Sequence, residues 1–377
     1  MMKTLKIALL ASGFCMTSSV FAADVVVNDA VSFQLGGKLH VDAGTVDDGT
    51  NSQADGQLRR LRLGVSGKWG KDVRTELEYD LSDNTPKLKD AYIEYRGIPH
   101  TQVRLGNAKT AVGFENLTSS SDTLFMERAL PSALLPGRTT AIQVSQYRDN
   151  GSIVVGVAGG TPTTLGEISN SVNEQELLYA HATRLLLNKK HHVLHIGASF
   201  ARTDPHEQST RFSTTLESVF GVERLDTGKI KNATSYTTQG VEMAWAKDAL
   251  LVQGEYLHTT VARDNRPDVN LHGGYVAAAY TVTGEKRRYN SKDAQFEGIQ
   301  PKRDQGAVEL VARVSALDLD SDNISGGSVR GQTLGANYYY NDKVRLMLDY
   351  SRMQAAPDKS GDTVTDNILQ ARLQVSF

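Results

Sequence analysis

Residues 57–69 read QLRRLRLGVSGKW, and their side chains alternate between two chemical classes. Leu61, Leu63 and Val65 fall on one face of an extended strand, whereas Arg60 and Arg62 fall on the other. Alternation with a period of two predicts a β-strand that has one apolar and one polar face. The same alternation recurs in residues 73–81, 91–96, 344–350 and 369–377.

Counting every segment with this period predicts about sixteen strands. Their expected spans are 31–43, 57–69, 72–81, 88–97, 101–107, 139–148, 151–160, 176–187, 192–202, 235–246, 249–263, 270–281, 304–318, 329–340, 343–356 and 365–377. Most of them have the length of tilted strands that cross a membrane. A soluble β-sandwich also alternates, but it needs neither strands of this length nor a terminal aromatic residue. We therefore expect an all-β protein, a sixteen-stranded antiparallel transmembrane β-barrel.

The connections between these strands alternate in length. Short turns are expected at 70–71, 97–99, 149–150, 188–190, 247–248 and 341–342, and longer polar loops at 44–56, 108–138, 161–175, 203–234 and 319–328. Bacterial barrels have short periplasmic turns and longer extracellular loops. The exception is residues 282–303, a long basic connection where this count puts a periplasmic turn. A solvated basic loop is the slightly preferred interpretation of this segment.

The N-terminus has the three regions of a secretory signal peptide. Lys3 and Lys6 are basic, residues 7–16 are apolar, and Val20-Phe21-Ala22 is a small-x-small cleavage site. We expect residues 1–22 to be a cleaved signal peptide and residues 23–377 to form the barrel, although an interfacial helix is the alternative. Cys15, the only cysteine, lies in the segment to be removed and follows Phe14, so neither a lipoprotein signal nor a disulfide is expected.

Charge and motifs argue against other classes of protein. The expected mature chain carries 39 basic and 43 acidic residues, which gives no support for nucleic-acid binding. Phosphate-cradling loops, GxSxG and HExxH motifs are absent from the sequence, and the histidines lack metal-ligand spacing. We expect no catalytic residue, no cofactor and no bound metal.

The segment DAYIEYRGIPHTQVRLGNAKTAVGFENLTSSSDTLFMERALPSALLPGR (90–138) resembles the phosphate-selective porin O/P family. Residues 281–289 (TVTGEKRRY), 306–319 (GAVELVARVSALDL) and 369–377 (LQARLQVSF) also resemble this family, so the resemblance covers nearly the whole expected mature chain. It implies a sixteen-stranded homotrimeric porin in the outer membrane with a positively charged lumen. It also implies a third loop folded into that lumen and a C-terminal Phe377 that serves as an assembly signal. The resemblance further suggests that the connection 282–303 can fold back into the periplasmic mouth.

The third external loop, residues 108–138, is the clearest candidate for a constriction. Its apolar residues can pack against a barrel wall, so this connection is not expected to be disordered. They are Leu117, Leu124, Phe125, Met126, Leu130, Leu134 and Leu135. Arg128 and Arg138 are expected to line the constriction and attract anions, or else to pair with carboxylates and only hold the loop.

Strand parity assigns further charged residues to the lumen. The inward basic residues are Arg60, Arg62, Arg74, Arg104, Arg313, Arg345 and Arg372; the inward acidic residues are Glu76, Glu78, Asp80, Glu94, Glu255, Glu309 and Asp349. Of the wall arginines, we expect Arg60, Arg62, Arg74, Arg104 and Arg313 to form the anion path together with the loop arginines. Inward arginines lower the barrier to an anion, but the inward acids leave selectivity open.

The expected function is diffusion of small hydrophilic solutes across the outer membrane, favouring anions such as phosphate or polyphosphate. The expected partners are two further copies of the chain, outer-membrane lipids and small anionic solutes. A non-selective or cation-preferring porin on the same fold is the first alternative. A barrel hydrolase and an adhesive barrel with a plugged lumen are the others.

Overall fold

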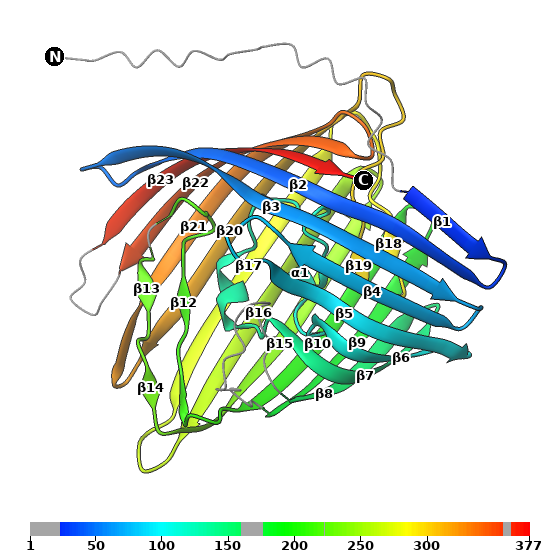
Figure 1. Cartoon of the computed structure of the whole chain (residues 1–377). Coiled ribbons are helices and arrows are strands. Elements are labelled where there is room, and N and C mark those ends of the chain that lie inside the picture. The colour runs from blue at the N-terminus through cyan, green and yellow to red at the C-terminus, as the bar shows by residue number, and fades with distance from the viewer. Residues whose placement is uncertain (1–22, 160–175, 222, 357–362) are drawn as a thin grey trace.

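The computed structural model describes residues 23–159, 176–221, 223–356 and 363–377. Seventeen of its strands form one antiparallel sheet that curves round and closes into a barrel (Figure 1). The expected signal peptide and the expected loop at 161–175 lie outside the described residues. Within these residues, no helix is long and apolar enough to cross a membrane.

Sixteen strands form the barrel wall. They are β2 (Val31–Asp47), β3 (Ser52–Trp69), β4 (Val73–Asp80), β5 (Lys87–Ile98), β6 (Thr101–Lys109), β7 (Arg138–Arg148), β8 (Gly151–Gly159), β9 (Glu176–Lys189), β10 (His192–Asp204), β15 (Ala233–Lys247), β16 (Leu250–Arg263), β17 (Val269–Thr281), β20 (Ala307–Ser321), β21 (Ile324–Tyr339), β22 (Val344–Ala356) and β23 (Val364–Ser376). All sixteen predicted strands are present, so the predicted fold class is confirmed.

The barrel closes where the first and last wall strands pair. β2 pairs with β23 from Lys38–Ser376 to Asp47–Asn367, and the main chains of Gly37 and Phe377 exchange hydrogen bonds of 2.8 and 3.0 Å. An additional strand, β1 (Ala23–Asn28), pairs with the first part of β2 beyond the end of β23. β1 was not predicted from the sequence.

The alternating faces of the strands point as predicted. Leu346, Leu348 and Tyr350 of β22 are exposed on the outside, whereas Arg345 and Asp349 are buried inside. An apolar exterior around a polar lumen is the arrangement that a bilayer requires of a barrel.

Two predicted loops are mostly strand. β2 and β3 remain paired out to Asp47–Ser52, and β20 and β21 out to Ser321–Ile324, so the loops predicted at 44–56 and 319–328 shrink to short turns. Outside the membrane, a β-hairpin does not need an apolar face. The backbone ladder therefore continues after the sequence alternation has ended.

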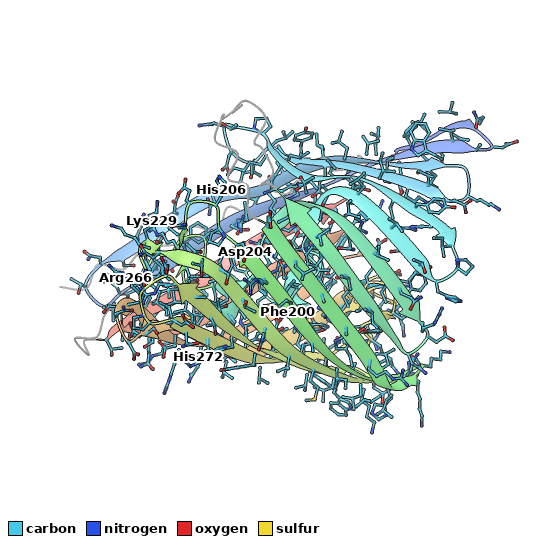
Figure 2. All side chains as sticks on the ribbon, turned by 90° about the horizontal axis from the view of Figure 1, so that it is seen from below. Phe200, Asp204, His206, Lys229, Arg266 and His272 are labelled. Atoms are coloured by element: carbon cyan, nitrogen blue, oxygen red, sulfur yellow. The ribbon has the colours of Figure 1, made fainter. Side chains whose placement is uncertain are left out.

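Three connections carry elements of their own. The third external loop contains α1 (Phe114–Leu117) and the 3₁₀ turn η1 (Leu130–Leu134). The connection between β10 and β15 holds β11 (Ser209–Thr210), β12 (Ser213–Thr214), β13 (Leu225–Asp226) and β14 (Ile230–Lys231), and the one between β17 and β20 holds β18 (Tyr289–Asn290) and β19 (Gln295–Phe296). Figure 2 shows His206, Lys229 and Arg266 at one rim of the barrel, which is the end with the longer loops.

Candidate functional site: the polar cavity beside the third loop

The third loop lies inside the barrel, as predicted, and packs against one half of the wall. Phe114, Leu124 and Phe125 are at most 3% exposed and share a cluster with small inward residues of β17, among them Ala277 and Ala279. Leu130 and Leu134 of η1 join a second cluster with inward residues of β16, β17, β20, β21, β22 and β23. Burial of these apolar side chains stabilises the inward position of the loop.

Three wall arginines fix the backbone of this loop. Arg313 donates to the carbonyl of Glu127 at 3.0 Å, and Arg345 donates to the carbonyls of Thr123 and Leu124 at 2.8 and 3.2 Å. Arg372 binds the carbonyl of Met126 and pairs with Asp42 through two bonds of 2.7 Å. These arginines point into the lumen, as their strand parity predicts, but the loop covers them.

Acidic wall residues hold the same loop through its amide groups. Glu255 accepts from the amide of Phe114 at 3.0 Å, and Asp349 accepts from the amide of Met126 at 2.8 Å. These inward acids are therefore occupied by the loop rather than placed along an open path.

The opposite half of the lumen remains open. A cavity of about 410 Å³ lies between the loop and the inner faces of β2 to β9. The charged residues that line it are Lys38, Arg60, Arg62, Arg104, Lys109, Arg128, Arg138 and Lys292, together with Glu76, Glu78, Asp90 and Asp293. Eight cations against four carboxylates give this lining a formal charge of +4.

Three cations of this lining, Lys109, Arg128 and Lys292, bind no carboxylate among the described residues, and two of them, Lys109 and Arg128, bind the same loop carbonyls. Lys109 Nζ donates to the carbonyls of Asn116 and Thr118, each at 2.9 Å. Arg128 donates to the carbonyls of Glu115, Asn116 and Thr118 at 2.9 to 3.3 Å. The two cations thus share the carbonyl groups of one short loop segment and leave their charge uncompensated.

Other cations of the lining are paired. Arg62 binds Asp80 at 2.8 Å and Glu78 at 3.1 Å, and Arg138 binds Asp90 through two bonds of 2.9 and 3.2 Å. Arg104 binds Glu94 and lies 4.3 Å from the ring centroid of Tyr92. Arg104 and Arg138 thus both line the cavity and hold a wall carboxylate.

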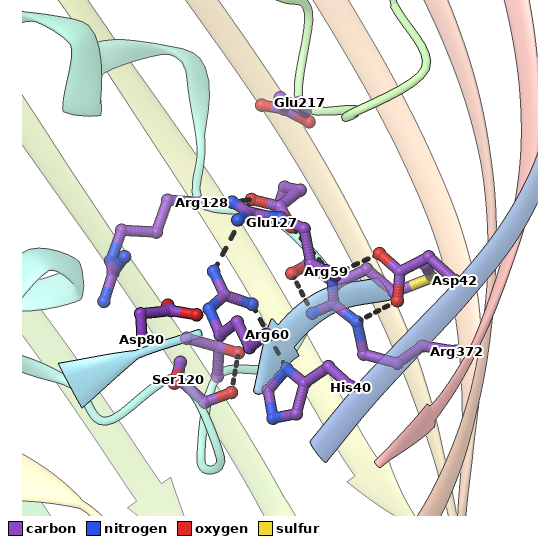
Figure 3. A network of polar contacts seen from close by, with 12 residues as sticks. His40, Asp42, Arg59, Arg60, Asp80, Ser120, Glu127, Arg128, Glu217 and Arg372 are labelled. Atoms are coloured by element: carbon purple, nitrogen blue, oxygen red, sulfur yellow. Dashed lines mark hydrogen bonds and ion pairs between the residues drawn. The ribbon is translucent and has the colours of Figure 1, made fainter. Parts of the chain in front are cut away.

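The carboxylate of Glu127 in the third loop is surrounded by three wall arginines (Figure 3). It accepts two bonds of 2.9 Å from Arg59 and one of 2.7 Å from Arg372, and Arg60 lies 3.9 Å away. Burial alone would raise the pKa of the Glu127 carboxyl, but Arg59, Arg60 and Arg372 hold it well below its usual range. Glu127 and Arg128 are adjacent in the chain but point to opposite sides (Figure 3).

Arg59 was not predicted as a lumen residue, because simple alternation places it outside with Leu61. A bulge pairs His40 with Arg60 and the next residue, Val41, with Leu58, so Arg59 is the extra residue. A bulge of this kind re-aims a side chain. Nothing in the alternation of residues 57–69 signals it.

The connection from residue 282 to 306 folds into the lumen, so the favoured solvated loop was wrong. Arg287 binds Glu309 through two bonds of 2.8 Å, and Tyr289 lies 2.7 Å from Nδ1 of His195. Phe296 is 3% exposed and packs with Phe114 and other residues of the third loop. The ion pair and the apolar contact offset the solvation that this basic segment loses.

Two arginines of the expected anion path do not line the cavity. Arg313 is 3% exposed, binds Glu217 and lies 4.2 Å from the ring centroid of Phe125 beneath the loop. Arg74 lies at the turn end of β4 and donates to the carbonyl of Val73. Arg60, Arg62, Arg104, Arg128 and Arg138 remain in the lining, and Lys38, Lys109 and Lys292 are added to it.

Comparison with known proteins places this barrel in a family. The family model described as phosphate-selective porin O and P matches residues 33–377. Porin O of Pseudomonas aeruginosa is 25% identical over an alignment of 432 residues that covers 99% of this chain and 97% of the relative.

Solved structures share the fold. The outer membrane channel DcaP of Acinetobacter baumannii superposes with a TM-score of 0.61 at 13% identity, covering 94% of this chain and all of that one. The anion-selective porin of Comamonas acidovorans gives 0.53 at 13% identity, covering 92% and 100%. OmpT of Vibrio cholerae, described in its trimer form, gives 0.59 at 11% identity, covering 93% and 100%. With sixteen strands closed around an inward third loop and a family match that spans 33–377, this chain belongs to the phosphate-selective porin O and P family of outer-membrane channels.

Proposed function

We propose that this channel passes small hydrophilic solutes by diffusion and favours anions, phosphate and polyphosphate among them. The observation that carries the proposal is the pair Lys109 and Arg128, two cations that line the cavity and are bound only by carbonyl groups within the described chain. A permeating anion gives up part of its water, and the positive charge of cations that make no ion pair compensates for part of that loss.

The surrounding arginines extend this preference along the wall. Arg60, Arg62 and Arg138 lie in the same lining, and a guanidinium fork matches two oxygens of a phosphate group. The carboxylates that bind these arginines reduce the positive potential in the cavity. The net charge of the lining therefore decides whether the channel prefers anions or cations. Passage needs no chemical step on the solute, in keeping with a family of channels.

The test is the reversal potential of single channels under a gradient of potassium chloride, repeated with potassium phosphate. The wild type is expected to reverse on the anion side in both salts. Arg60→Glu and Arg62→Glu are each expected to shift the potential toward cations. Arg148→Glu is the control, because Arg148 lies at the periplasmic end of β7 on the exposed outer face. A cation-selective wild type would instead support a cation-preferring porin on this fold.

We also propose that residues 1–22 are removed on export and that the mature barrel is a homotrimer. The trimer form of OmpT, which shares the fold, supports this assembly. Phe377 exchanges main-chain hydrogen bonds with Gly37 of β2 at the seam, where the first and last wall strands pair, and we propose that it serves as the assembly signal. Mass spectrometry of the purified protein and its mobility before and after heating test both points.

A further inference from the structure

The outer face of β20 to β23 changes from apolar to polar toward the loop end of the strands. Leu334, Tyr350 and Leu369 are exposed neighbours in one cross-strand row. In the next row toward the loops, Gln332 pairs with Arg352, and in the row after that Arg330 pairs with Gln354. All four polar side chains are exposed on the outside of the barrel.

Arg330 and Arg352 are cations without a partner in the described part of the chain, where they make no hydrogen bond or ion pair. Within the described residues, the acidic neighbour nearest in register is Asp318, which pairs with Ser328 one row above Arg330. Asp318 Oδ1 accepts a hydrogen bond from the amide of Asp320 at 2.9 Å. Two unpaired guanidinium groups on a lipid-facing wall are unusual, because a lipid-exposed charge costs free energy unless it lies near the interface.

A groove runs beside these arginines across β16, β17 and β20. It has a volume of about 700 Å³ and is lined by Gly274, Ala316, Val276, Val314 and both arginines, among others. Gly274 pairs with Ala316, and Ala316 pairs with Arg330, so two small residues lie in the same cross-strand row as the Arg330 guanidinium. The outer face of the barrel here thus combines a groove lined by small and apolar residues with two adjacent cationic groups.

We propose that Arg330 and Arg352 bind the phosphate group of an outer-leaflet lipid, with an acyl chain lying along Val276 and Val314. The loop end of the barrel is the extracellular end, since bacterial barrels carry their longer loops outside. Charge-assisted bonds from two arginines suit a phosphate, and the groove accommodates the hydrocarbon attached to it. A free solute has no apolar part to fill this groove, which favours a lipid as the occupant.

The test uses the full-length channel, purified in detergent and incubated with diphosphorylated lipid A. Native mass spectrometry counts the lipid molecules retained, and lipid A without phosphates is run in parallel. We expect wild-type protein to retain the phosphorylated lipid preferentially. Arg330→Gln/Arg352→Gln is expected to lower that retention about tenfold or more, since it removes two charge-assisted phosphate contacts. Equal retention by the double variant would overturn the proposal.

Arg148→Gln is the matched control, an exposed outward arginine at the opposite end of the barrel. Equal loss of lipid in this control would show non-specific attraction and overturn the proposal. Displacement of the lipid by excess inorganic phosphate would show a site for the free ion and overturn it as well. A double variant that loses its trimer but keeps its lipid would identify the surface as a subunit contact instead. Conductance and reversal potential of the double variant are expected to match the wild type, because these arginines face away from the lumen.

Discussion

Replacing Arg372 with methionine tests how the third loop is held. Arg372 is 2% exposed and binds Asp42, Glu127 and the carbonyl of Met126. Asp42 is 1% exposed, so the substitution leaves a buried carboxylate without its cation. Breaking one partner of such a buried pair costs about 3–5 kcal/mol. We expect the free energy of unfolding to fall by that amount. Mean conductance should change little, because Arg313 and Arg345 still bind the loop.

The assay is urea unfolding of the barrel in lipid vesicles, followed by the fluorescence of Trp69 and Trp245. Adding Asp42→Asn to the variant removes the stranded charge and is expected to recover about 2 kcal/mol. Arg148→Met is the control, since an exposed surface substitution changes stability by about 0.5 kcal/mol or less. If Arg372→Met unfolds within about 1 kcal/mol of the wild type, the proposed role of this ion pair in fixing the loop is refuted.

Three further predictions concern the loop and the seam. Deleting residues 119–134 is expected to raise single-channel conductance and weaken anion preference, and an unchanged conductance would show that the loop does not limit the pore. Deleting Phe377 is expected to lower the yield of heat-modifiable trimer in the outer membrane, and a normal yield would argue against its role in assembly. The lowered pKa of Glu127 means that its contribution to stability is present above about pH 4.3, the ordinary value for glutamate, and is lost only as the pH falls through its lower folded value. We therefore expect Glu127→Gln to destabilise the barrel equally at pH 7 and pH 5 in urea unfolding; a loss that disappears at pH 5 would contradict this.

The alternation in the sequence predicts the strands of the barrel wall and the direction of their side chains, but it does not predict which of these side chains the segments inside the lumen cover. Parity along a strand assigns each side chain to the lipid or the lumen, and it placed Arg60, Arg62 and Arg372 correctly on the inside. It does not say which inward residues another segment covers. Arg313 lies beneath the third loop because Phe125 packs over its guanidinium, a contact between residues 188 positions apart in the chain.

Local irregularities account for the other differences. Lys109 lies beyond the fifth predicted strand, 101–107, whereas the corresponding strand β6 continues to Lys109. Arg59 was missed because a single bulge reverses its direction. The sequence of residues 282–303 predicts a solvated basic loop, whereas the pairing of Arg287 with a wall carboxylate and the packing of Phe296 against the third loop hold this segment in the lumen.

The most direct test of the proposed anion preference is the reversal potential of Lys109→Gln/Arg128→Gln beside that of the wild type. Glutamine keeps an amide donor for the carbonyl groups of residues 116–118, while the formal charge of the lining falls from +4 to +2. We predict an anion-selective wild type, a shift toward zero in the double variant, and the opposite shift in Glu78→Gln, which removes one negative charge from the lining, frees Lys38 and leaves Arg62 bound to Asp80 alone. A wild type that prefers cations, or a double variant whose reversal potential equals that of the wild type, would contradict the proposal that these two cations set the selectivity of the channel.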